Sequence, residues 1–552
     1  MTVINSLPNE CFQEIFEHVS NQGPGLFSSL LVNKIWCINV VYVLWSRPFE
    51  KKYKFVKTPI IIQTYLRFLS IEDRKEIETL INKNTHSESD GGGYDVELTR
   101  KPLFDYPKYL KELDFQVFVH KIVEWAGTKN KKLRNQDNYN DIISLIIDQL
   151  IRLFSRKSNN LDYLSYCASR SWSKAPNFEF LNDDDNNNSI SSINNEGNVN
   201  FLINLTQFQF HIWNLNDDDD GNIVKFVNLV GSSSKKIRKL DISYGDDKEE
   251  NITNSIIELI KKQRNLYDIL IKRHSNNISS LIKALECQSN SLRSLSIKDA
   301  IFDIEDFKIL SKFRNIYQLA MENCAPSSKD FKNSLADSNF SFKNLDFGFY
   351  KMDRDYYPKY QNEFIKSSGK NCKRLITNFF TVEIGNAIIN HCDNIEEFKI
   401  IGILTPCYPI VIRVLNNFKN SLKKLSLRFD SNPMEEVNLI NLLKNNLPLN
   451  LEYLRIVINN EGDLKELSDL LSSNEIASLN TLIIQNNNHK HETEILKIIL
   501  NFVNNNKIST LKTLGMNYKK RDDEKEAIEL NRKLVEDYKI QIYHIEDLKT
   551  WF

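Results

Sequence analysis

One short pattern of apolar positions recurs through the second half of the chain. It consists of an apolar residue, two others, an apolar residue, one other and a last apolar residue, as in LRSLSI from Leu292 and LKKLSL from Leu422. This alternation with a period of two predicts a short strand. Copies begin at Leu205, Ile237, Leu266, Leu292, Ile316, Phe342, Cys372, Ile395, Leu422, Leu451, Leu479 and Leu511. Their mean spacing of about 28 residues is typical of a solenoid of stacked repeats.

Helical patterns lie between the strand patterns. Segments such as YPIVIRVLNNF and ETEILKIILNFV carry apolar residues at helical spacing. A strand followed by a helix, repeated, predicts an α/β solenoid with parallel strands and outer helices. A single repeat cannot bury its own apolar face, so stacking stabilises the array. Leu295, Leu425 and Leu454 are then equivalent core positions that face the helices. Two independent amphipathic domains are the alternative.

The repeats resemble leucine-rich-repeat proteins of the long, strand-plus-helix kind. That family carries Asn or Cys eight residues after the first apolar residue, and Cys324, Asn459 and Asn487 match this position. Ala300, Tyr350 and Phe380 do not. The resemblance implies a concave sheet that binds another protein.

The first fifty residues contain two further helical patterns, separated by Gly23-Pro24-Gly25. Asn5 and Ser6 are residues that favour the start of a helix, and Pro8 fits its first turn. The first helix has one apolar face, whereas the second is apolar nearly all round, as expected of a helix that is buried on both sides. Because a hairpin of this size cannot bury two faces by itself, we expect a partner surface.

This segment resembles the F-box, a helical hairpin that docks on the linker subunit of a cullin–RING (SCF-type) ubiquitin ligase. The resemblance is carried by LP at the start, IF within the first helix, LVNKxW and LW. It implies that the linker-binding surface is formed or supported by Leu7, Pro8, Ile15, Phe16, Leu31, Val32, Trp36 and Trp45. The alternative is an ordinary amphipathic helix pair that closes off a larger domain.

Three regions follow from these patterns. Residues 1–50 form the F-box-like hairpin, residues 51–200 a helical spacer with low-complexity loops, and residues 201–552 the leucine-rich-repeat-like solenoid. The boundary lies in the stretch Asn182 to Asn200, which contains DDDNNN and need not be ordered.

Composition limits the classes of function. The chain has 552 residues with 72 basic and 72 acidic side chains, so it has no overall attraction for nucleic acid or an anionic membrane. No apolar run is long enough to span a membrane. The start lacks the features of a signal peptide, and the eight cysteines contain no CxxC pair. Reduced thiols in a cytoplasmic or nuclear protein are therefore expected.

Catalytic motifs are absent from the sequence. It contains no GxSxG, HExxH, phosphate-binding loop or dinucleotide fingerprint, and His489 and His491 lack a third metal ligand at useful spacing. We therefore expect no enzyme, no cofactor and no metal.

The predicted function is a substrate-recognition adaptor that holds a target near a ubiquitin ligase. The alternative is a leucine-rich-repeat scaffold that binds a partner without ubiquitination. Because side chains alternate along a strand, residues two, four and six positions after the first apolar one should point to the concave side. The later copies place a basic strip there, formed by Arg374, Lys399, Lys424, Arg428 and Arg455. The strip also contains the aromatic Tyr453 and the acidic Glu397. Earlier copies place Glu322 and Asp346 there instead.

Arginine suits bidentate recognition of carboxylate or phosphate, and a tyrosine adds a flat contact. The strip therefore predicts a target with an acidic or phosphorylated segment. The alternative is a set of solvated strand ends without a single ligand.

Overall fold

The computed structural model divides the chain into two compact units, Met1–Asn276 and Asn277–Phe552. It describes residues 7–20, 25–50, 58–82, 102–129, 139–168, 201–212, 220–245, 250–327, 340, 342–348, 357–378, 380–403, 405–429, 439–444, 446–458, 461–472, 478–486, 491–505, 510–517 and 525–545.

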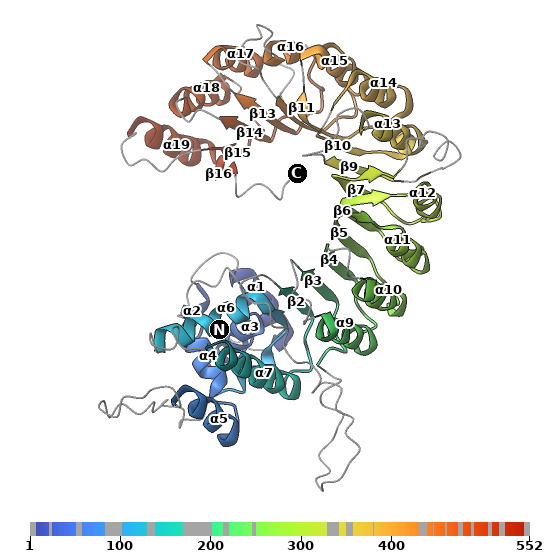
Figure 1. Cartoon of the computed structure of the whole chain (residues 1–552). Coiled ribbons are helices and arrows are strands. Elements are labelled where there is room, and N and C mark those ends of the chain that lie inside the picture. The colour runs from blue at the N-terminus through green and yellow to red at the C-terminus, as the bar shows by residue number, and fades with distance from the viewer. Residues whose placement is uncertain are drawn as a thin grey trace. The chain divides into compact units, whose positions relative to one another are not determined.

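The first unit begins with helices and continues as a parallel sheet. The helices are α1 (Asn9–Ser20), α2 (Gly25–Ser29), α3 (Lys34–Ser46), α4 (Thr58–Leu66), α5 (Ile71–Asn82) and the 3-10 helix η2 (Tyr106–Tyr109). The strands are β1 (Glu112–Asp114), β2 (Tyr163–Ala168), β3 (Gln207–Ile212), β4 (Lys239–Ser243) and β5 (Asp268–Asn277). Each pairs in parallel with the next. The connecting helices are α6 (Phe115–Lys129), α7 (Tyr139–Lys157), α9 (Asp220–Ser233) and α10 (Glu250–Lys262), and α9 and α10 lie on the same side of the strands (Figure 1).

The second unit is a longer sheet of the same kind. Its strands are β6 (Ser294–Phe302), β7 (Gln318–Glu322), β9 (Asn344–Gly348), β10 (Arg374–Thr377), β11 (Glu397–Ile403), β12 (Lys424–Phe429), β13 (Tyr453–Ile458), β14 (Thr481–Asn486), β15 (Thr513–Met516) and β16 (Gln541–His544). They pair in parallel in this order, and the short β8 (Ala325–Pro326) pairs with β6.

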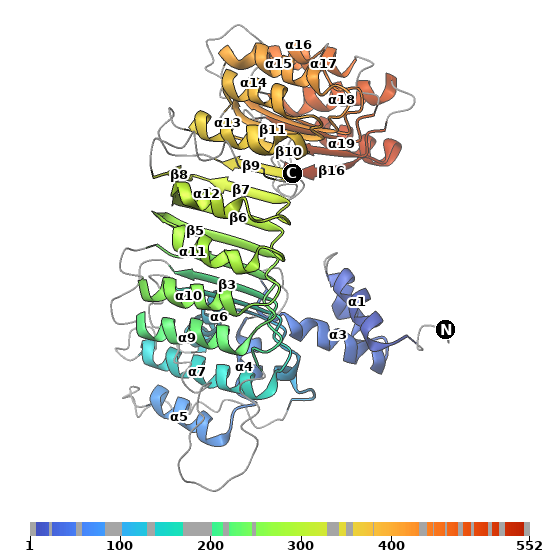
Figure 2. The ribbon, with the colours of Figure 1, turned by 90° about the vertical axis from the view of Figure 1, so that its right-hand side faces the viewer.

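Helices connect the strands of the second unit and cover one face of them (Figures 1 and 2). They are α11 (Ser279–Leu285), α12 (Ile304–Leu310), α13 (Tyr357–Ser368), α14 (Val382–His391), α15 (Tyr408–Asn417), α16 (Leu439–Leu443), α17 (Glu461–Leu471), α18 (Glu492–Asn505) and α19 (Lys525–Tyr538). The described connections also contain the 3-10 turns η5 (Glu286–Gln288), η7 (Gly369–Asn371) and η8 (Thr405–Cys407).

The predicted α/β repeat architecture is confirmed. Each of the twelve predicted copies contributes a strand, from β3 through β15. Leu425 lies in register with Phe398 on one side and Leu454 on the other, and Leu295 occupies the same position in β6 opposite Leu319. Leu295, Leu425 and Leu454 are fully buried, as the repeat pattern predicts.

The sheet starts earlier than the predicted boundary at residue 200. Two further copies of the pattern, LKELDF from Leu110 and LDYLSY from Leu161, form β1 and β2, and Leu113 pairs with Leu164. The predicted spacer of residues 51–200 therefore contains part of the sheet. These copies do not follow the mean spacing of the later repeats, because they lie 51 residues (161 − 110) and 44 residues (205 − 161) before the next copy.

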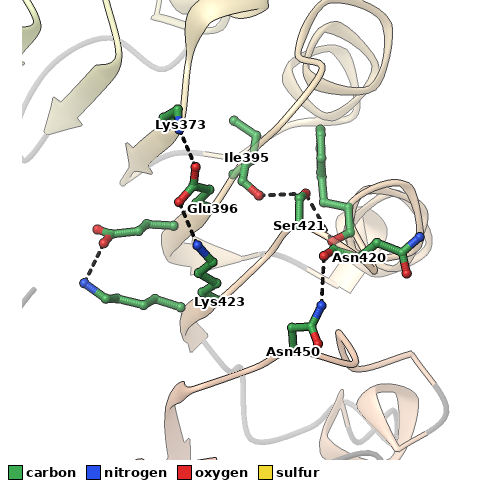
Figure 3. Close-up of polar contacts among 10 residues, drawn as sticks. Lys373, Ile395, Glu396, Asn420, Ser421, Lys423 and Asn450 are labelled. Atoms are coloured by element: carbon green, nitrogen blue, oxygen red, sulfur yellow. Dashed lines mark hydrogen bonds and ion pairs between the residues drawn. The ribbon is translucent and has the colours of Figure 1, made fainter. Parts of the chain in front are cut away.

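Hydroxyl side chains at the start of several repeats form hydrogen bonds to the preceding repeat. Ser158, Ser234, Ser421, Ser478 and Thr510 each donate to the carbonyl oxygen of the first apolar residue of the preceding copy, at 2.7–3.0 Å. Figure 3 shows the bond from Ser421 to Ile395 and the nearby bond from Asn450 to the carbonyl of Asn420. Since a buried carbonyl without a partner is costly, these bonds stabilise the stacking of one repeat on the next.

Candidate functional site

The N-terminal hairpin has a small aromatic core of its own. Phe12 and Phe16 of α1 are buried against Leu26, Val40 and Val43, and the half-buried Trp36 packs on this cluster. The rings of Phe16 and Trp36 meet edge to face, with 5.3 Å between their centroids. This arrangement fixes the angle between α1 and α3.

A buried asparagine ties the two helices together. The Asn39 side-chain amide donates to Asn9 Oδ1 (3.0 Å) and to the carbonyl of Ile35 (2.9 Å), and Gln13 Nε2 donates to Asn39 Oδ1 (3.4 Å). Asn33 caps the start of α3, because its Oδ1 accepts from the backbone N–H of Trp36 at 2.9 Å. The hairpin is therefore held by directional bonds as well as by apolar packing.

The outside of this hairpin carries many exposed apolar side chains among its polar ones. Of the seventeen large hydrophobic residues that are exposed in the described part of the chain, seven fall between residues 7 and 38: Leu7, Ile15, Phe27, Leu31, Val32, Ile35 and Ile38. Leu31 is 89% exposed. Leu31 and Val32 lie in the turn between α2 and α3, and Ile35 and Ile38, three residues apart, are neighbours on one side of α3. In Figure 2, α1 and the start of α3 stand clear of the strands of the first unit.

The structure separates the predicted linker-binding residues into an exposed group, a buried group and Trp45. Leu7, Pro8, Ile15, Leu31 and Val32 are exposed, and any partner can reach them. Phe16 is only 2% exposed and belongs to the hairpin core with Trp36. Phe27, Ile35 and Ile38 extend the exposed group, and the nearly continuous apolar sequence of this segment could have identified them.

Trp45 has a different place from the other predicted residues. Its ring stacks on Tyr106 (4.1 Å between centroids) and meets Tyr65 edge to face (5.2 Å). Nearby, the Nε of Arg47 lies 2.8 Å from Glu112 Oε1 on β1. Burial raises the pKa of Glu112, and the Arg47 guanidinium opposes this. Trp45 thus helps to anchor α3 to the rest of the first unit.

The predicted basic strip of the second unit is largely paired within itself. Glu397 lies between two of its bases, with Arg374 Nε at 3.2 Å and Lys424 Nζ at 2.5 Å. Arg455 donates to Gln485 Oε1 at 3.1 Å. The pKa of Lys399 is lowered by burial and by the neighbouring Arg455.

Acidic side chains of earlier strands also enter this face. Burial raises the pKa of the Asp346 carboxyl, while Arg374 and Lys399 act in the opposite direction. Lys298 Nζ and Glu322 Oε2 form an ion pair at 2.5 Å. The strand face of the second unit is therefore a mixed charge network, in which Arg428 is an exposed member.

The expectation that Tyr453 offers an exposed flat contact is wrong. Its side chain is only 5% exposed and packs with Ile483, Ile545 and Tyr543. Burial raises its pKa to about 12. Tyr543 and Ile545 cover this ring, so it is not accessible from outside. Whether Arg374, Lys399, Lys424, Arg428 and Arg455 contact a target stays a prediction.

The remaining candidate chemistry is limited. Among the described residues, no three His, Cys, Asp or Glu side chains are grouped so that they could hold a metal ion. His489, Asn459 and Asn487 lie outside the described residues. Cys324 is buried, and its Sγ contacts the carbonyl oxygens of Ile297 and Glu322 at 3.3 and 3.4 Å. Within the described ranges, no helix is long and apolar enough to cross a membrane.

Comparisons with known proteins bear on the fold alone. No family model matches the sequence, and no curated protein matches it. The structure is similar to that of the leucine-rich repeat-containing protein LegL7 from Legionella pneumophila, with 10% identity, a TM-score of 0.34, and coverage of 55% of this chain and 94% of that one. It is also similar to an internalin (inlF) from Listeria monocytogenes, with 14% identity, a TM-score of 0.24, and coverage of 70% and 80%.

Proposed function

We propose that this chain is a substrate-recognition adaptor of an SCF-type ubiquitin ligase. The N-terminal hairpin docks on the linker subunit, and the repeats present a surface to a target protein. The adaptor catalyses nothing itself and acts in the cytoplasm or nucleus. It raises the concentration of target lysines near an activated ubiquitin, which is catalysis by proximity.

The exposed apolar surface of the hairpin is the observation that carries this proposal. Monomeric proteins rarely leave many large apolar side chains exposed close together, and such groups mark interaction sites. The hairpin has its own core and its own hydrogen bonds, and Leu31 and Val32 are 89% and 56% exposed outside that core. The F-box-like sequence signals LP, IF, LVNKxW and LW fall on the same hairpin. A protein-binding repeat scaffold without a ligase is the second candidate.

Binding of the full chain to purified linker subunit tests the proposal. Because Leu31 is 89% exposed, Leu31→Ala leaves the fold intact and removes only contact with a partner. Side chains at the centre of an interface cost roughly 2 kcal/mol or more when truncated, so we expect binding to weaken about 30-fold.

The matched control is Leu103→Ala in the same unit, since Leu103 is 85% exposed and undergoes the same chemical change. It should bind the linker subunit like the parent. Equal affinity for Leu31→Ala and the parent, or no binding by the parent, rejects the adaptor and leaves the scaffold.

A further inference from the structure

A second polar surface of the second unit lies at the edge where its strands begin. The residue directly after the first apolar residue of each copy occupies this edge. Across six neighbouring strands, from β6 to β12, these residues form what we call the edge row: Arg293, Tyr317, Lys343, Lys373, Glu396 and Lys423. It contains four bases, one aromatic residue and one acid.

Backbone hydrogen bonds hold the edge row rigidly. The carbonyl of Arg293 accepts from the N–H of Tyr317 at 2.8 Å, and the carbonyl of Tyr317 accepts from Lys343 at 2.9 Å. The carbonyl of Lys343 then accepts from Lys373 at 2.8 Å, and the same pattern continues to Lys423. Neighbouring strands lie about 4.8 Å apart, so the six residues span roughly 24 Å. A ligand therefore meets side chains whose backbone is already ordered, which lowers the entropy cost of binding.

The acid of the edge row is already neutralised. Glu396 lies 2.6 Å from Lys373 Nζ and 3.2 Å from Lys423 Nζ, as Figure 3 shows. These bonds lower the pKa of its carboxyl, so the group stays ionised and occupied. The three side chains together carry one net positive charge.

The other half of the edge row has no such neutralisation. Among the described residues, no carboxylate forms an ion pair with Arg293 or Lys343, and Arg293 Nη1 reaches only the carbonyl of Asn315 at 3.4 Å. Tyr317 stands between them with 44% of its surface exposed. Two cations therefore flank an accessible aromatic ring.

We propose that the edge row binds an extended acidic polypeptide segment of the target, an inference that rests on the proposed role of the repeats as a target-binding surface. Arginine pairs with carboxylates through two N–H groups, lysine supplies a point charge, and the tyrosine ring supplies apolar contact. A peptide extends by about 3.3 Å per residue, so about seven residues cover the row.

Charge favours a peptide over a nucleic acid. Single-stranded nucleic acid binds grooves that are continuously positive and lined with several aromatic rings. The edge row has one ring and includes an acid, and the whole chain has a formal net charge of zero. The single ring and the acid of the edge row therefore fit an acidic peptide better than a nucleic-acid strand whose bases need several stacking rings.

The test is fluorescence anisotropy of a labelled decaglutamate peptide with the full chain, at low salt and at about 0.15 M salt, where screening acts over about 8 Å. The double variant Arg293→Gln, Lys343→Gln removes two positive charges from the edge row. The matched control, Lys308→Gln, Lys366→Gln, removes two from helices α12 and α13 of the same unit, where both lysines are exposed. We expect about tenfold weaker binding for the row variant and less than about twofold change for the control.

Three results would overturn the inference: no binding by the parent, equal effects of the two double variants, or tighter binding of a ten-residue oligothymidylate than of decaglutamate. The Leu31→Ala variant should bind decaglutamate like the parent. If the parent failed to bind the linker subunit but still bound decaglutamate, the adaptor role would be rejected and the proposal for the edge row would be retained.

Discussion

Leu425→Ala tests the repeat core of the second unit most directly. Leu425 is fully buried, and its backbone lies in register between Phe398 of β11 and Leu454 of β13. Both neighbours are themselves buried, at 1% and 0% exposure, and are held by the parallel hydrogen-bond ladder. The strands therefore cannot close around the missing atoms, and the substitution leaves a cavity. A Leu→Ala change of this kind costs about 2–5 kcal/mol.

Hydrogen–deuterium exchange measured by mass spectrometry reports this cost locally. Each 1.4 kcal/mol is a factor of ten in an equilibrium constant, so opening of β12 should become about 30-fold to several thousand-fold more frequent. Repeats contact mainly their neighbours, so we expect the largest effect in β11, β12 and β13 and a smaller one in β6 and β7.

Leu449→Ala is the control, because Leu449 lies just before β13 and is 51% exposed. It should change the free energy of unfolding by less than about 0.5 kcal/mol. A cost below about 1 kcal/mol for Leu425→Ala, or equal costs for the two substitutions, would refute the assignment of Leu425 to a packed repeat core.

Two further predictions concern glycines and thiols. In Gly385→Ala the new Cβ overlaps the Ile410 side chain, so the free energy of unfolding, measured by thermal unfolding, should fall by about 1–3 kcal/mol. In the control Gly221→Ala the new Cβ meets no atom within 4 Å, so the free energy of unfolding should rise by about 0.5–1 kcal/mol. A thiol reagent at pH 8 should modify the exposed Cys11 in the folded chain and spare Cys324, because burial raises the pKa of Cys324 to about 12 and keeps its thiol protonated. Peptide mass spectrometry distinguishes the two cysteines. Rapid labelling of Cys324 without unfolding would contradict its burial.

The hairpin shows how far a local pattern reaches. Sequence alone predicted two helices with too much apolar surface. The structure divides the second of them into α2 and α3, and Leu31 and Val32 are exposed in the turn between these two. It could not separate them from Phe16, which is equally apolar but buried. Which apolar face of a helix packs inward depends on where its neighbours lie, and in this hairpin Asn39 and Trp36 fix that choice.

The repeat strands were determined by sequence, because period-two alternation is a property of a few consecutive residues and each strand buries one side. The same local rule did not predict every strand at the two ends of the array. The strands β1 and β2 were not predicted, because long connections separate their copies from the next ones. The strand β16, whose Gln541 pairs with Thr513, was not predicted because Lys539 occupies the first apolar position of its copy.

Only the tertiary structure decided which side chains remain available to a partner. Tyr453 is covered by Ile545, 92 residues later in the chain (545 − 453), and Glu397 joins Arg374 to Lys424 across three strands. Accessibility and charge at one strand are set by side chains of other repeats. The alternation within one repeat fixes the direction of a side chain, and the neighbours that stacking brings to it fix what that side chain can bind.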